Sequence, residues 1–144
     1  MPVLQKELLT AITAVTRASR LTQKVFSSIQ AGQANSAGTI TKQDKSPVTI
    51  ADYGSQALVN AILHSVFPND PIVGEEDSGE LRSNPQLREK VWRLVSSTLQ
   101  DVSSVDLERE GGNIPNADEM MRFIDKGCAA GGATGRISND SGGF

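Results

Sequence analysis

A long apolar repeat at residues 2–30 constrains the fold more than any other feature of this 144-residue sequence. Its apolar side chains recur at steps of three and four residues: Leu4, Leu8, Ile12, Val15, Ala18, Leu21, Val25 and Ile29. This period is typical of one face of an α-helix. Pro2 suits a position just inside a helix start. The pattern therefore predicts a long amphipathic helix with a single apolar stripe, of the kind that normally faces a core.

Three later segments also have helical patterns. In the first, Leu58, Ile62 and Val66 define a helix from Ala51, with Thr49 and Asp52 at the spacing of a capping box. In the second, Asn84 is the expected cap of a helix that starts at Pro85, with an apolar stripe at Leu87, Val91, Leu94, Val95, Leu99 and Val102. A short helix is expected between Asn116 as its cap and Gly127 as its stop.

Short β-prone segments lie between these helices. The sequences "TIT" at 39–41 and "PVTI" at 47–50 flank a polar turn and predict a hairpin. The sequence "IVG" at 72–74 predicts a buried strand. The chain has the size of one ordinary domain.

Composition excludes several classes of function. The chain has 14 basic and 17 acidic side chains, for a formal charge of −3. This balance argues against a nucleic-acid partner and against a basic membrane-binding patch. No apolar run reaches the length of a membrane span. The single cysteine, Cys128, cannot form an intrachain disulfide, which favours a reducing, cytoplasmic location.

The acidic sequence "GEEDSGE" at 74–80 directly follows the expected strand. Glu75 and Glu76 could lie in a solvated acidic loop, or they could bind a hard cation such as Mg²⁺, which prefers oxygen ligands. Asp52 has two readings as well. It could cap its helix, or it could orient and deprotonate a metal-bound water.

Other polar residues have simpler interpretations. Residues 41–46 form a charged turn, His64 is expected to be a surface or half-buried residue, and Cys128 an inert thiol. The sequence "GGATGR" at 131–136 lacks both the spacing and the terminal Lys-Ser/Thr pair of a phosphate-binding P-loop, and no helix follows it as a dinucleotide fingerprint requires.

Taken together, "KSPVTIAD" at 45–52 and "VGEE" at 73–76 resemble the N-terminal region of 3′(2′),5′-bisphosphate nucleotidases. These enzymes are in the magnesium-dependent, lithium-sensitive superfamily that includes inositol monophosphatases. The first helix and "GGATGR" also match, so the resemblance covers residues 3–136. It implies a layered α/β sandwich, of which residues 1–136 would supply N-terminal helices, a hairpin and one or two further strands.

The resemblance also implies a site and a reaction. Glu75 would bind magnesium directly, Asp52 would position and activate the attacking water, and Glu76 would support the site from behind. The substrate would be adenosine 3′,5′-bisphosphate or 3′-phosphoadenylyl sulfate, which would lose its 3′-phosphate. Metal ions assist such phosphoryl transfer by lowering the pKa of water and neutralising developing charge. The complete family enzyme is expected to be a monomer.

The sequence departs from the family pattern after Arg136. The family continues with an Asp-Pro-Ile-Asp-Gly-Thr motif whose aspartates bridge metals, whereas here "ISNDSGGF" follows, and residues 137–144 are expected to be a disordered tail. We therefore expect a shortened enzyme with little or no activity by itself. The alternatives are an inactive fragment, an interaction module, or an inositol phosphatase of the same superfamily.

Overall fold

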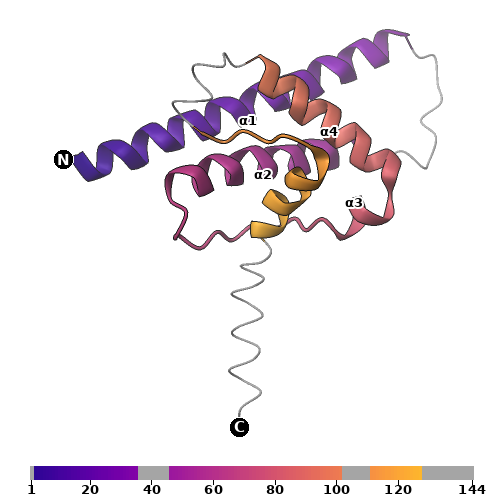
Figure 1. Cartoon of the computed structure of the whole chain (residues 1–144). Coiled ribbons are helices and arrows are strands. Elements are labelled where there is room, and N and C mark those ends of the chain that lie inside the picture. The colour runs from indigo at the N-terminus through magenta and orange to yellow at the C-terminus, as the bar shows by residue number, and fades with distance from the viewer. Residues whose placement is uncertain (1, 36–45, 102–110, 128–144) are drawn as a thin grey trace.

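The computed structural model describes residues 2–35, 46–101 and 111–127. The helices are α1 at Pro2–Asn35, α2 at Pro47–Val66, α3 at Gly79–Ser83 and α4 at Pro85–Gln100, with a further helix at 117–127. The first two run in opposite directions and α4 lies across them, while the segment after α2 runs back beneath it toward α3 (Figure 1). Within these described ranges, no helix is both long and apolar enough to cross a membrane.

The expected hairpin is wrong where it can be checked. Residues 47–50 form the first turn of α2, and "TIT" lies outside the described residues. The hydroxyl of Ser46 accepts a hydrogen bond from the backbone N–H of Thr49 at 3.3 Å, and Pro47 follows the cap directly. A side-chain cap followed by proline is a strong helix start, which outweighs the β propensity of valine, threonine and isoleucine. The cap is therefore Ser46, and the predicted capping box of Thr49 and Asp52 is wrong.

The segment "IVG" is not a strand either. Residues 72–74 have no regular structure, and no strand occurs anywhere in the described ranges. A strand needs a neighbour that pairs with successive backbone groups, but within the described residues this segment is bonded to another through the N–H of Gly74, which donates to the carbonyl of Gly127 at 3.0 Å. The described part of the chain is therefore helical, and the α/β sandwich remains a prediction.

The apolar stripe of α1 does not face the core along its whole length. Leu4, Leu8, Ile12 and Val15 are 52–67% exposed. Farther along the helix the stripe does face the core, since Leu21 is fully buried and Val25 packs against the core. In the earlier turns the buried residues are Thr10, Ala14 and Arg17. Their spacing of three and four residues shows that this part of α1 packs through a face beside the predicted stripe, with small and polar side chains among its contacts.

The caps predicted for the two later helices are confirmed. Asn84 accepts a hydrogen bond from the N–H of Leu87 at 3.1 Å, and Asn116 accepts one from the N–H of Glu119 at 2.8 Å. The short helix α3 was not predicted from the sequence. Cys128, residues 36–45 and the tail at 137–144 lie outside the described residues.

One apolar cluster joins α1, α2, α3, α4 and the helix at 117–127. Its buried members are Leu21, Ala51, Tyr53, Ala57, Leu58, Ala61, Leu81, Leu87, Val91, Val95, Leu99, Ile114, Met120, Met121 and Ile124. Because α2 contributes to this core from Ala51 to Ala61, the middle of the helix is fixed and can serve as a rigid support for polar side chains.

Candidate functional site

One side of α2 bears three polar residues at steps of four, namely Asp52, Gln56 and Asn60. Residues at this spacing lie above one another on a helix. Their exposure falls along the helix, because Asp52 is exposed, Gln56 is half-buried and Asn60 is only 3% exposed. Side-chain amides buried in this way need hydrogen-bond partners.

The amide of Gln56 binds the acidic segment that follows α2. Its Oε1 accepts a hydrogen bond from the backbone N–H of Glu76 at 3.0 Å, and its Nε2 donates to the carbonyl of Glu76 at 2.7 Å. The same Nε2 also donates to the carbonyl of Ile124 at 2.9 Å. We call these three bonds the Gln56 clamp. The clamp fixes the backbone at Glu76 against α2, one helical turn from Asp52.

The amides of α2 also complete the end of the helix at 117–127. Gln56 reaches the carbonyl of Ile124, and Asn60 donates to the carbonyl of Phe123 at 2.8 Å. The last carbonyls of a helix have no partner within it, so these side chains satisfy groups that would otherwise be buried without hydrogen bonds.

Glycine is required where the three segments meet. A Cβ at Gly74 would lie 2.6 Å from the Oε1 of Gln56, and a Cβ at Gly127 would lie 2.9 Å from its Nε2. These separations are closer than real Cβ contacts. The absence of side chains at both positions therefore allows the backbone to approach the Gln56 amide.

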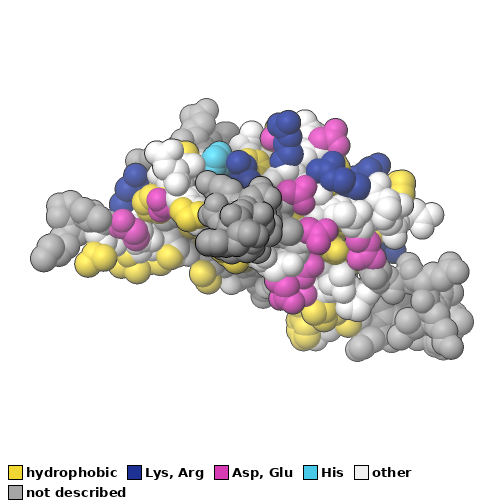
Figure 2. Space-filling view, turned by 90° about the horizontal axis from the view of Figure 1, so that it is seen from below, with side chains coloured by type: hydrophobic (Ala, Val, Ile, Leu, Met, Phe, Trp, Pro, Cys, Tyr) yellow, Lys and Arg dark blue, Asp and Glu magenta, His cyan; other side chains and the backbone are white. Residues whose placement is uncertain are grey.

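Acidic side chains crowd the same region. Figure 2 shows several of them close together on the face seen from below. Partial burial raises the pKa of Glu76, and the negative charges of Asp52, Glu75, Asp77 and Glu80 raise it further. Asp52 and Glu75, which are distant in the sequence, thus both act on the carboxyl of Glu76.

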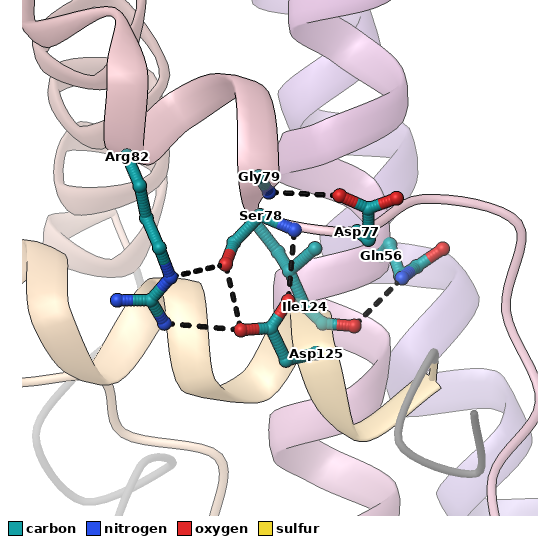
Figure 3. Close-up of polar contacts among 7 residues, drawn as sticks. All are labelled: Gln56, Asp77, Ser78, Gly79, Arg82, Ile124 and Asp125. Atoms are coloured by element: carbon teal, nitrogen blue, oxygen red, sulfur yellow. Dashed lines mark hydrogen bonds and ion pairs between the residues drawn. The ribbon is translucent and has the colours of Figure 1, made fainter. Parts of the chain in front are cut away.

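A second polar network fixes the far end of the acidic segment. Asp125 accepts hydrogen bonds from the backbone N–H of Ser78 at 2.8 Å, the hydroxyl of Ser78 at 2.6 Å and the Arg82 guanidinium at 3.0 Å (Figure 3). Burial alone would raise the pKa of Asp125, but the bonds from Ser78 and Arg82 lower it overall. Asp125 is therefore a structural anion that joins α3 to the helix at 117–127.

Tyr53 adds one more contact between α2 and the acidic region. Its hydroxyl donates to the carboxylate of Glu80 at 3.1 Å. Burial, this hydrogen bond and the neighbouring acids raise the pKa of the Tyr53 hydroxyl to about 12. Tyr53 is thus a hydrogen-bond donor at neutral pH, and it does not act as a base.

Asp52 and Glu75 are both near enough to Glu76 to raise its pKa, but the three residues do not form a full metal site. Asp52 and Glu75 are exposed, and Glu76 is half-buried. Among the described residues, no three His, Cys, Asp or Glu side chains form a group that could hold a metal. Magnesium is often bound by one or two carboxylates, with water and substrate phosphate supplying the other oxygens. Asp52 and Glu75 therefore have the right ligand chemistry for Mg²⁺ but do not complete its coordination.

Other predictions and omissions also have clear outcomes. His64 is half-buried, as expected, with its ring centroid 6.2 Å from that of Phe123. The sequence analysis missed Gln56 and Asn60, although their signal was present. Asp52, Gln56 and Asn60 follow one another at steps of four residues, and two amides in such a row indicate a polar face with specific hydrogen-bond partners.

Comparisons with known proteins give a consistent family. The chain is 51% identical over 127 residues to a 3′(2′),5′-bisphosphate nucleotidase of Schizosaccharomyces pombe. The aligned region covers 88% of this chain and 35% of that protein. It is 44% identical over 134 residues to the enzyme of the same name from Emericella nidulans, covering 92% of the chain and 36% of the relative. It is also 39% identical over 136 residues to the 3′(2′),5′-bisphosphate nucleotidase 1 of Arabidopsis thaliana, covering 92% of the chain and 36% of the relative.

These relatives are much longer than the region they share with this chain. The chain spans about a third of the length of the curated relatives that it matches. No family model matches the sequence.

Proposed function

We propose that this chain supplies part of the active site of a magnesium-dependent phosphatase. The proposal rests on its similarity to the 3′(2′),5′-bisphosphate nucleotidases, which confirms the resemblance seen in its sequence motifs. The substrate is adenosine 3′,5′-bisphosphate or 3′-phosphoadenylyl sulfate, which loses its 3′-phosphate. The observation that carries this proposal is the sequence identity of 35–51% to proteins of that name over most of this chain.

Three acidic residues have distinct parts in the proposed reaction. Asp52, exposed on the rigid helix α2, accepts a proton from the attacking water. Glu75, exposed on the segment below α2, is a ligand for the cation. Glu76, whose backbone is bound by Gln56, supports the arrangement and keeps its neighbour near α2. The water oxygen bonds to phosphorus as the bond between phosphorus and the 3′-oxygen breaks, and the 3′-oxygen takes up a proton from solvent, so that phosphate and the 5′-nucleotide are released.

Magnesium, when bound, would lower the pKa of water and offset the charge that develops on the phosphoryl oxygens. The crowding around Glu76 supports a cation here, because the neighbouring negative charges that raise the pKa of Glu76 would be offset by a positive charge between them. The remaining oxygen ligands would come from water, from the substrate and from protein groups beyond the described residues.

Full activity requires more of the fold than these helices provide. The relatives are nearly three times as long as the region that they share with this chain. We propose that the complete α/β sandwich and the nucleotide-binding surfaces also need a region like the one that the relatives have outside the shared part. By itself the chain is expected to show little turnover. A cytoplasmic location and a monomeric state of the complete enzyme remain predictions.

A chimeric enzyme tests the proposal directly. The homologous region of the S. pombe nucleotidase would be replaced by residues 3–136 of this chain, and phosphate release from adenosine 3′,5′-bisphosphate measured with magnesium. We expect the chimera to be active and Asp52→Asn or Glu75→Gln to reduce kcat by at least about a hundredfold. Glu89→Gln is a matched control, since Glu89 is an exposed acid on α4 paired with Arg93.

Two outcomes would contradict the proposal. Full activity in the Asp52→Asn and Glu75→Gln chimeras would remove these residues from the reaction. A chimera that hydrolyses inositol monophosphate in preference to the nucleotide would favour the inositol phosphatase alternative.

A second candidate function is that of an interaction module. The exposed stripe of α1, namely Leu4, Leu8, Ile12 and Val15, forms a row of apolar side chains on the surface. Such rows mark interaction surfaces. We propose the remaining part of a longer nucleotidase as its partner, because the relatives have about two thirds of their length outside the shared region.

Mixing the chain with the remaining part of the S. pombe enzyme tests this candidate. A 1:1 complex in light scattering that is lost in a Leu8→Asp, Ile12→Asp variant would support it. Self-association of the chain through the same residues, with no binding to the enzyme part, would contradict it.

A further inference from the structure

The Gln56 clamp uses the hydrogen-bonding groups of one carboxamide on two different segments. Its oxygen accepts from the N–H of Glu76, and its nitrogen donates to the carbonyls of Glu76 and Ile124, with distances of 2.7–3.0 Å. A side chain that pairs with both backbone groups of one residue replaces the neighbouring strand that this segment lacks. The backbone at Glu76 is therefore held by a side chain of α2.

This contact fixes the acidic segment relative to Asp52. Gln56 and Asp52 are four residues apart on α2, so their positions are related by one turn of a rigid helix. Glu75 precedes the residue that Gln56 binds. The place of Glu75 relative to Asp52 is thus determined through one short chain of contacts, from α2 to the Gln56 amide to the backbone of Glu76.

We infer that Gln56 is a positioning residue that sets the spacing of the Asp52 and Glu75 carboxylates, and thereby the affinity of the site for a divalent cation. This inference rests on the proposed function. Gln56 itself is neither a ligand nor a base, because its amide groups are bonded to backbone atoms. Its effect on the cation acts through the position of Glu75.

The neighbouring amide provides a matched control within the same helix. Asn60 also lies on α2 and also donates to the end of the helix at 117–127, but its partner is the carbonyl of Phe123. This hydrogen bond joins α2 to the helix at 117–127 and not to the acidic segment. Loss of Asn60 should therefore reproduce the structural cost of losing an amide without altering the position of Glu75.

The experiment uses the full chain and two measurements. Amide hydrogen exchange at Glu76 reports the clamp directly, and Mn²⁺ binding followed by electron paramagnetic resonance reports the carboxylate site without requiring turnover. We compare wild type with Gln56→Ala, Gln56→Met and Asn60→Ala. The methionine variant keeps the length and helix propensity of glutamine, so that at least one variant retains the fold, as circular dichroism would verify.

In both Gln56 variants we expect exchange at the Glu76 amide to rise about tenfold, from the loss of one hydrogen bond. We expect the Kd for Mn²⁺ to rise about tenfold or more, the usual effect of removing a residue that orients a metal ligand. Asn60→Ala should leave both quantities within about twofold of wild type.

Unchanged exchange at Glu76 in folded Gln56 variants would overturn the inference. An equal loss of Mn²⁺ affinity in Asn60→Ala would also overturn it, since the effect would then be one of general stability. Failure of the proposed function has a different signature, in which Asp52→Asn and Glu75→Gln leave wild-type Mn²⁺ binding unchanged while exchange at Glu76 still responds to Gln56.

Discussion

The two long helices α1 and α2 differ in how their apolar patterns relate to their burial. The first has the longer apolar repeat, yet Leu4, Leu8 and Ile12 are 67%, 60% and 52% exposed. The second has a shorter repeat, and its Leu58 and Ile62 are fully buried. An apolar period therefore predicted both helices. In α1 it predicted the packed face around Leu21 and Val25, but not in the turns from Leu4 to Val15.

Steric fit against α2 and hydrogen bonding to Gly111 determine which face of α1 packs. Leu21 lies against α2 where Gly54 leaves room for it, and Arg17 donates to the carbonyl of Gly111 at 2.9 Å. Close approach of two helices favours small residues and well-paired polar groups at the contact. The apolar side chains Leu4, Leu8, Ile12 and Val15 of α1 are left exposed in this structure.

Truncation of one leucine on each helix should give the largest contrast. Leu58→Ala is expected to lower the free energy of unfolding by about 2–5 kcal/mol, because it leaves a cavity in a fully buried site. Leu8→Ala should change it by less than about 0.5 kcal/mol, since Leu8 is 60% exposed. Urea unfolding followed by circular dichroism measures both. A large loss for Leu8→Ala would show that the stripe of α1 is covered in solution.

Replacing glycine by alanine should change the stability of the protein in opposite directions on the two helices. At Gly54 a new Cβ would lie 2.7 Å from Cδ1 of buried Leu21, so Gly54→Ala should destabilise by about 1–2 kcal/mol after its gain in helix propensity. At Gly32 of α1 a Cβ would meet nothing within 4 Å, so Gly32→Ala should stabilise by about 0.5–1 kcal/mol. Thermal unfolding of the two variants would separate these effects, and stabilisation by Gly54→Ala would contradict the close contact.

Asp125 should make stability depend on pH. Its folded pKa is lowered below the ordinary value of 3.8, so its contribution is present above that value and is lost as pH falls through the folded pKa. Asp125→Asn should cost about 1 kcal/mol at pH 7, reduced by partial exposure, and the difference from wild type should shrink below about pH 4. Unfolding curves at pH 7 and pH 3 test this. A difference that does not depend on pH would contradict an ionised Asp125.

Helix caps should have smaller, similar effects at two sites. Ser46 caps α2 and Asn84 caps α4, each through one hydrogen bond to a backbone N–H. Replacement of either by alanine should lower stability by about 1 kcal/mol. A negligible effect at Ser46 would mean that Pro47 alone is sufficient to start α2.

Much of the candidate site could have been read from the sequence, and some of it could not. Asp52, Glu75 and Glu76 were predicted as site residues from "KSPVTIAD" and "VGEE", and their roles stay predictions. In the folded chain the charges of Asp52 and Glu75 raise the pKa of Glu76. The partners of Gln56 lie 20 and 68 residues away in the sequence. No local pattern specifies such partners, because the contact exists only once α2, the acidic segment and the helix at 117–127 are assembled.

The sequence by itself determined where most helices form, where two of them start and to which family of proteins the chain is related. These properties depend on the spacing of apolar residues and on caps that act within one helical turn. The tertiary structure alone decided which face of α1 is packed in the turns from Leu4 to Val15, that residues 72–74 lack a strand partner, and that Gln56 holds the acidic segment. Each of these depends on a partner distant in the chain, and burial and hydrogen-bond satisfaction are properties of the assembled molecule.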